Sequence, residues 1–219
     1  MQKLLSTCIL FFSILIGNDL DLQDGIIAYA ARAENAQGTI AQQGQIDKAI
    51  TIFNQIYQGS ANECEAGVYL LKSYYYKGKF AVQDDELKKG IFNLGKSLGE
   101  ELIKKNPNSV GAHYWYLVNL GSWAEVYGII AAAKEGVADL MREHSEKIIA
   151  LDSQYADGGG YFMLGAVHFK SPYIPFILSW PSNDKAVEFL TKAFELGDQT
   201  PSQTVYLARA LHKDEQKNK

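Results

Sequence analysis

Cysteine and proline are scarce in this chain of 219 residues, which contains two cysteines and five prolines. Cys8 lies within an apolar N-terminal segment, so removal of that segment would leave Cys64 as the remaining thiol. A single thiol forms no internal disulfide, and the fold must therefore be held together by packing. No histidine is near Cys64 in the sequence, so a small packing residue on a helix is a better interpretation than a nucleophile.

An excess of basic charge is also missing. The chain has 21 Lys and Arg residues against 25 Asp and Glu residues, which gives a formal net charge of −4. Surfaces that bind nucleic acids normally carry a basic stripe that releases counterions from the phosphates. Because basic residues here cluster only in pairs and in the C-terminal tail, we expect no nucleic-acid partner.

Motifs for catalysis and metal binding are absent as well. The histidines lie apart from one another and without the paired spacing of zinc sites, at His113, His144, His168 and His212. His144 lies among glutamates, where exposure on a charged helix face is the simpler interpretation. Glu125 and Glu135 lack a third catalytic group, and no glycine-rich segment has the context of a phosphate-binding loop. We therefore expect no enzymatic activity, no bound metal and no cofactor.

The most apolar run lies at the N-terminus, where residues 1–18 read MQKLLSTCILFFSILIGN. A lysine followed by a short apolar segment is typical of a secretory signal, and the segment is short for a transmembrane helix. Gly17 offers a small residue for cleavage, whereas the pattern Ala28-Tyr29-Ala30 follows an unusually long, acidic stretch. We expect residues 1–18 to be a signal peptide or an N-terminal membrane anchor, and the protein to be exported.

The rest of the chain shows helix patterns with the period of a tetratricopeptide repeat, which is about 34 residues. The first unit is predicted to have one helix over residues 33–40, a turn at Gly44, and a second helix containing Ala49. One period later, Gly67 and Gly78 occupy the positions equivalent to Ala33 and Gly44. Two successive first helices therefore agree in phase.

Later units keep the helices but separate them further. The second helix of unit two ends late, at Pro107, and that of unit three ends late, near Leu151. In unit four, the irregular residues 169–184 precede Ala186 and Ala193, which restore the repeat spacing. Three of the four units thus carry an insertion between their paired helices. We expect these insertions to build walls around a concave surface or to lengthen the helices that line it.

Small residues mark the expected turns and helix crossings. We predict a turn within residues 153–160, which contain Asp157, Gly158 and Gly159, and a close helix crossing at Gly165. The sequence therefore predicts an all-α fold, a tetratricopeptide-like superhelix of helix pairs (an α-solenoid) with insertions between the paired helices. We expect it to span residues 19–213, followed by a polar tail at residues 214–219.

Aromatic residues are dense in and beside the insertions. Trp123 is expected in a turn, where small polar residues are usual, and the loop 171–181 carries more apolar groups than water would tolerate. We therefore predict a pocket for a hydrophobic ligand, while a role in the core or at a subunit interface stays open. The candidate ligand-binding residues are Trp115, Asn119, Trp123, Tyr127, Tyr173, Phe176 and Trp180.

Two sequence blocks resemble a known family. AHYWYLVNLGSWAEVYGI and ALDSQYADGGGYFMLG, followed by a proline-containing loop, resemble the T component (TatT-like) proteins of tripartite ATP-independent periplasmic (TRAP) transporters. Regulators of microtubule dynamics look like more distant relatives. The resemblance covers roughly residues 90–211, and this chain has Gly160 and Phe162 where the family tends to have Pro and Arg. Its most specific elements are Trp115, Asn119, Gly121, Trp123, Ala156, Asp157, Gly158, Gly159, Leu164 and Gly165.

This resemblance implies an α-helical periplasmic protein that assembles as a homotrimer. It also implies that the protein binds the solute-binding protein of a TRAP-type transporter and handles a hydrophobic small molecule. The competing expectation is a general tetratricopeptide adaptor that binds peptide segments and has no role in transport.

Overall fold

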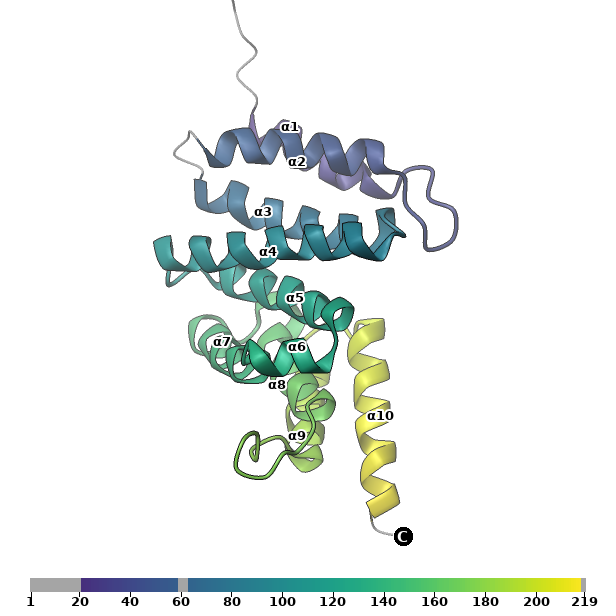
Figure 1. The fold of residues 1–219 in the computed structure, drawn as a ribbon, viewed down its shortest axis with the longest axis vertical. Coiled ribbons are helices and arrows are strands. Elements are labelled where there is room, and N and C mark those ends of the chain that lie inside the picture. Colours follow the sequence, from purple (N-terminus) through teal and green to yellow (C-terminus); the bar gives the residue numbers. More distant parts are fainter. Residues whose placement is uncertain (1–20, 59–62, 218–219) are drawn as a thin grey trace, which may run out of the picture.

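The computed structural model describes residues 21–58 and 63–217, and these residues form helices joined by turns and loops, with no strand among them (Figure 1). The predicted signal peptide or membrane anchor at residues 1–18 lies outside the described residues. Within the two described ranges, no helix combines the length and the apolar character needed to cross a membrane.

The helices follow one another in pairs. The pairs are α1 (Leu22–Ala30) with α2 (Gln43–Tyr57), α3 (Glu63–Tyr76) with α4 (Asp85–Lys105), α5 (Val110–Tyr127) with α7 (Val137–Leu151), and α8 (Tyr155–Lys170) with α9 (Asn183–Leu196). Each helix of a pair packs against the other, α3 also packs against α5, and α10 (Pro201–Lys217) packs against α9 (Figure 1). The predicted all-α stack of helix pairs is therefore confirmed, and the expected polar tail from residue 214 continues α10 as far as Lys217.

The first helix lies earlier in the chain than predicted. Asp21 caps α1 by accepting a hydrogen bond from the backbone N–H of Gln23, and α1 gives way to the 3₁₀ turn Ala31–Ala33. Asn35 and Gly38 then adopt positive φ angles of 58° and 61°, which no α-helix accommodates. The predicted helix over residues 33–40 is therefore wrong.

The position of Gly44 is corrected for the same reason. Residues 34–42 form the connection between α1 and α2. Gly44 therefore lies in the first turn of α2 and not in that connection. Ala49, by contrast, is completely buried on α2, as the repeat pattern predicted.

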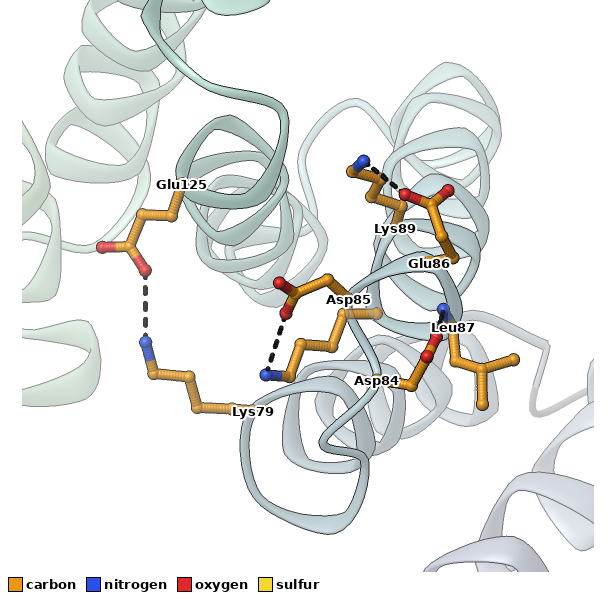
Figure 2. A network of polar contacts seen from close by, with 8 residues as sticks. Lys79, Asp84, Asp85, Glu86, Leu87, Lys89 and Glu125 are labelled. Carbon is orange, nitrogen blue, oxygen red and sulfur yellow. Dashed lines mark hydrogen bonds and ion pairs between the residues drawn. The ribbon is translucent and has the colours of Figure 1, made fainter.

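The connections between paired helices differ from one pair to the next. In the second pair, the π-helical turn Lys77–Ala81 contains the predicted turn glycine, Gly78, and the extra residues lengthen α4. Figure 2 shows Lys79 of this turn paired with Glu125 of α5 at 3.1 Å, and Asp84 capping α4 by accepting the N–H of Leu87. An exposed ion pair thereby links the turn to the next helix pair.

The other two insertions are the short helix α6 (Ile129–Lys134) and the loop 171–182. Helix α5 continues to Tyr127, and the chain turns only at Gly128, whose φ angle is 85°. Trp123 therefore lies within a helix, which corrects its predicted place in the turn. Small polar residues are favoured in turns and not inside a helix, so the ring of Trp123 can pack against neighbouring helices.

The predicted turn at the start of α8 and the predicted helix crossing further along it are both present. Ala156, Asp157 and Gly158 have positive φ angles of 52°, 55° and 75°, so the chain changes direction there. At Gly165, an added Cβ atom would lie 2.6 Å from Cγ of Leu190 on α9. The missing side chain therefore lets α8 and α9 cross closely.

The core consists of several clusters between the helices. One is built mainly by α5, α7 and α8, and its buried members are Phe92, Tyr116, Leu117, Leu120, Trp123, Val137, Met141, Ile148, Met163, Leu164 and Val167. Another lies among α1 to α5, with buried Ala28, Ala49, Phe53, Leu70, Leu71, Leu98, Leu102 and Ala112. Because each cluster joins neighbouring pairs, burial of apolar surface holds the stack together.

Candidate functional site

A row of half-buried aromatic side chains crosses the first helices of successive pairs. Tyr29 of α1 meets Tyr69 of α3 edge-on, with ring centroids 5.9 Å apart. Tyr114 of α5 contacts both the adjacent Trp115 at 5.4 Å and Tyr155 of α8 at 5.5 Å. We call this row the aromatic stripe. It comprises Tyr29, Tyr69, Tyr75, Tyr114, Trp115 and Tyr155, none of which is fully buried.

Helical spacing places the residues of α3 in the stripe. Tyr69, Lys72 and Tyr75 are separated by three positions each, so they share one face, and all three are half-buried. Leu70 and Ser73 lie on another face and are buried. Tyr75 then reaches the next pair, where its ring centroid is 6.1 Å from that of Trp115.

The stripe continues from α5 to α8. Gly159 leaves room for the ring of Tyr114, since an added Cβ atom would lie 2.5 Å from it. Burial raises the pKa of the phenol of Tyr155. Burial also raises the pKa of Tyr114 to about 12, so both hydroxyls stay protonated at neutral pH.

Two cations lie against the stripe. The guanidinium of Arg32 lies 4.2 Å from the ring centroid of Tyr29 and 5.2 Å from that of Tyr76. The ammonium of Lys72 lies 4.2 Å from the centroid of Tyr69 and 5.7 Å from that of Trp115. Burial lowers the pKa of Lys72, the charge of Glu65 opposes this change, and the charge of Arg32 adds to it. Aromatic faces thus hold two positive charges near each other.

The residues predicted to bind a ligand fall into different environments. Trp115 lies in the aromatic stripe. Asn119 is fully buried one turn later, where its Nδ2 donates to the carbonyl of Leu71 at 3.0 Å and to that of Trp115 at 2.8 Å. Asn119 therefore makes the interhelical hydrogen bond that was the alternative to a ligand contact.

Trp123 and Tyr127 lie between α4 and α5. Their rings stack with centroids 4.4 Å apart, and Asn93 of α4 bonds both of them. The indole N–H of Trp123 donates to Oδ1 of Asn93 at 2.7 Å, and Nδ2 of Asn93 donates to the hydroxyl of Tyr127 at 2.7 Å. These two aromatic residues hold helices together.

Trp180, Tyr173 and Phe176 come from the loop 171–182. Trp180 packs against α7, where it donates to Oδ1 of Asp139 at 2.9 Å and lies 4.4 Å from the guanidinium of Arg142. Tyr173 and Phe176 are 63% and 103% exposed. Paired backbone hydrogen bonds of 2.8 Å between Ile174 and Leu178 close the loop behind them. Packing anchors this loop and leaves its tip in solvent.

The seven predicted residues thus lie in separate packing environments, and ligand binding by them stays a prediction. A surface cavity among the described residues lies elsewhere, beside the start of α2, with the polar lining Glu34, Asn35, Gln42, Gly44, Gln45 and Lys48. Sequence reasoning missed every residue of the stripe except Trp115, and it missed both cations, Arg32 and Lys72. The tyrosine run of α3, at helical spacing, was the available signal.

The structure also brings together two histidines that the sequence keeps apart. Nδ1 of His113 on α5 lies 2.8 Å from Nδ1 of His144 on α7, and Nε2 of His113 donates to the carbonyl of Pro107 at 3.0 Å. In the neutral pair, His144 must therefore be the donor between the rings. His144 is half-buried, which corrects its predicted exposure on a charged face. No group of three or more potential metal ligands occurs among the described residues.

Comparison with solved structures gives a thermophilic tetratricopeptide-repeat protein of Thermus thermophilus as a similar fold. The match has 19% sequence identity and a TM-score of 0.58, and it covers 90% of this chain and 81% of that chain. The predicted tetratricopeptide-like architecture is thereby confirmed. No curated protein matches the sequence. The family model for regulator of microtubule dynamics protein 1-3 matches residues 35–219, which is most of the chain, and the chain therefore belongs to that family.

Proposed function

We propose that this chain is a non-catalytic scaffold that binds an extended segment of a partner protein along the aromatic stripe. Stacked helix pairs present extended surfaces built from several repeats, and such surfaces are used for binding. The stripe crosses α1, α3, α5 and α8, so one extended segment would contact most of the stack.

The observation that carries this proposal is the partial exposure of six neighbouring aromatic residues on the first helices. A sealed core would bury them, as it buries Phe53 and Tyr116. Aromatic rings supply large contact areas at low cost in side-chain entropy, and their polar tips hydrogen-bond peptide groups. A partner segment would cover this apolar surface and use the protonated tyrosine hydroxyls as donors.

A finer proposal concerns the partner. The sequence blocks around Trp115 and Gly158 resemble TRAP T components, which supports the solute-binding protein of a TRAP-type transporter as the partner. The apolar N-terminal segment supports export to the periplasm. Assembly as a homotrimer and handling of a hydrophobic small molecule belong to the same proposal. A general adaptor without a transport role is the alternative. Proximity of the gene to TRAP permease genes, together with recovery of the solute-binding protein in a pull-down, would favour the finer proposal.

The family match favours a second candidate, a role in regulating microtubule dynamics, as the family's name states for its members. Co-sedimentation of the purified chain with assembled microtubules would support this candidate. Recovery of a solute-binding protein and no co-sedimentation would contradict it.

The stripe itself is tested by capture of peptides. Pooled octapeptides are incubated with the immobilised full chain, and the retained peptides are quantified by mass spectrometry. Trp115→Ala and Tyr75→Ala should each lower retention about tenfold, because they remove central contact area. Phe176→Ala, which removes an exposed ring outside the stripe, is the matched control. Equal retention by all four proteins, with unchanged helical circular dichroism, would contradict the proposal.

A further inference from the structure

We infer that the aromatic stripe selects segments rich in aspartate and glutamate, whose carboxylates bind between Arg32 and Lys72. This inference rests on the proposed function, because it names the chemistry of the partner at the same surface. Four features support it: the neighbouring positions of the two cations, the lack of ion pairs to them among the described residues, their partial burial, and the aromatic surface that connects them.

The two cations occupy neighbouring positions on the stripe. Arg32 lies over Tyr29 and Tyr76, and Lys72, one helical turn before Tyr76, lies over Tyr69. The rings of Tyr29 and Tyr69 touch each other, so a continuous aromatic surface connects the two charges. A segment lying on this surface would meet both of them.

Neither cation forms an ion pair within the described structure. Its ion pairs involve other residues, for example Lys77 with Asp47 and Lys79 with Glu125, but neither Arg32 nor Lys72. Nη1 of Arg32 donates to the carbonyl of Tyr29 at 2.9 Å, whereas its Nε is buried and has no hydrogen-bond partner. A buried donor without a partner is uncommon, and here it belongs to the side chain that best recognises carboxylates.

The surroundings make the absence of an anion costly. Lys72 is half-buried among aromatic rings, the positive charge of Arg32 repels it, and the negative charge of Glu65 compensates this repulsion without forming an ion pair. A carboxylate at this position would interact favourably with both cations in a poorly hydrated environment. The aromatic rings beside it would receive the apolar residues of the same segment. The site thus suits acidic segments that also contain apolar residues.

The experiment uses the full chain and two octapeptide pools. One pool has Asp or Glu at alternate positions and mixed apolar residues between them, and the other has Asn or Gln in place of the acids. Retention of the acidic pool should exceed that of the amide pool by about tenfold, and the difference should shrink as salt is raised.

The variants Lys72→Met and Arg32→Gln should each lose most of the preference for acidic peptides but still bind the amide pool as the unmodified chain does. Lys72→Met keeps an unbranched apolar side chain on Tyr69. Lys192→Met is the matched control, because the ammonium of Lys192 likewise lies over a tyrosine ring, 4.4 Å from the centroid of Tyr161, but outside the stripe. Circular dichroism and thermal unfolding establish that each variant is folded.

Different failures identify different errors. Equal retention of both pools, lost in Trp115→Ala, would overturn the acidic preference and leave the peptide-binding function standing. Retention of neither pool above the level of Trp115→Ala would overturn both. An equal loss of both pools in Lys72→Met would show a structural role and overturn the inference. Vesicles of phosphatidic acid that bind in a Lys72-dependent manner, when acidic peptides do not, would overturn it in favour of a lipid phosphate.

Discussion

Trp123 of α5 donates its indole N–H to the side-chain carbonyl of Asn93 on α4 at a distance of 2.7 Å. The ring of Trp123 is only 6% exposed and belongs to the core cluster of α5, α7 and α8. One residue therefore joins the second helix pair to the third by a hydrogen bond and by apolar packing. This arrangement assigns Trp123 to the stability of the stack.

Trp123→Ala should lower the free energy of unfolding by about 3–5 kcal/mol, as is usual when a large buried ring is removed. Phe176→Ala should change it by less than about 0.5 kcal/mol, because the ring of Phe176 is fully exposed. Urea denaturation followed by circular dichroism measures both values. A stable Trp123→Ala protein that no longer binds a lipophilic probe would instead support the ligand pocket predicted from sequence.

Gly165→Ala should destabilise the protein by about 1–3 kcal/mol, because the new methyl group would overlap Leu190 and push α8 away from α9. Gly121→Ala is the matched control in α5, where an added Cβ atom meets nothing within 4 Å. That change should stabilise the helix by up to about 1 kcal/mol. Thermal unfolding of the two variants should therefore shift in opposite directions, and a shared direction would contradict the observed crossing.

Asn119→Ala should cost about 1–3 kcal/mol, because it removes a fully buried side chain and its hydrogen bond from α5 to the carbonyl of Leu71 on α3. Denaturant unfolding measures this loss. Ser97→Ala, on the exposed surface of α4, serves as the control and should have little effect. Unchanged stability of Asn119→Ala would show that the hydrogen bond contributes little, and a ligand contact would regain support.

Stability should decrease in mild acid. Burial lowers the pKa values of His113, His144 and His168 below the ordinary value of about 6.5. The unfolded chain then binds protons more readily than the folded chain, so the stabilising effect is present above about pH 6.5 and is lost as the pH falls below it. The free energy of unfolding, measured by denaturant titration at successive pH values, should fall on going from about pH 7 to about pH 5.

His144→Gln should reduce this slope, because it removes one histidine whose pKa is lowered by burial and by the charge of His113. His212→Gln removes an exposed histidine of α10 and is the control. A slope that His144→Gln leaves unchanged would mean that the pair of His113 and His144 does not contribute to it.

Much of the helical architecture was predictable from local patterns. The faces of α3 and α5, the turn near Gly158 and the crossing at Gly165 all follow from residues three and four apart or from small residues. The first helix was misplaced because α1 carries few repeat positions, whereas residues 33–40 have the spacing of a repeat helix at Ala33, Ala36 and Ile40. Asn35 and Gly38, which favour left-handed backbone, were the contrary signal.

The candidate site was less predictable, because the same helical face can serve as a core, a seam between helices or an open surface. Trp115 and Trp123 lie two turns apart on α5. Trp115 belongs to the aromatic stripe, whereas Trp123 is buried and hydrogen-bonded to Asn93 of α4. Aromatic density indicated where large contacts would form. It did not indicate which of them a neighbouring helix would cover.

By itself, the sequence determined that the protein is a stack of helix pairs, since periodicity, caps and turn residues act within a few positions of the chain. Only the tertiary structure decided what the stack presents to a partner. Arg32, Tyr69, Trp115 and Tyr155 lie on different segments, and His113 meets His144 across two helices. The packing of separate helices sets these distances and the burial of each charge, and no local pattern encodes them.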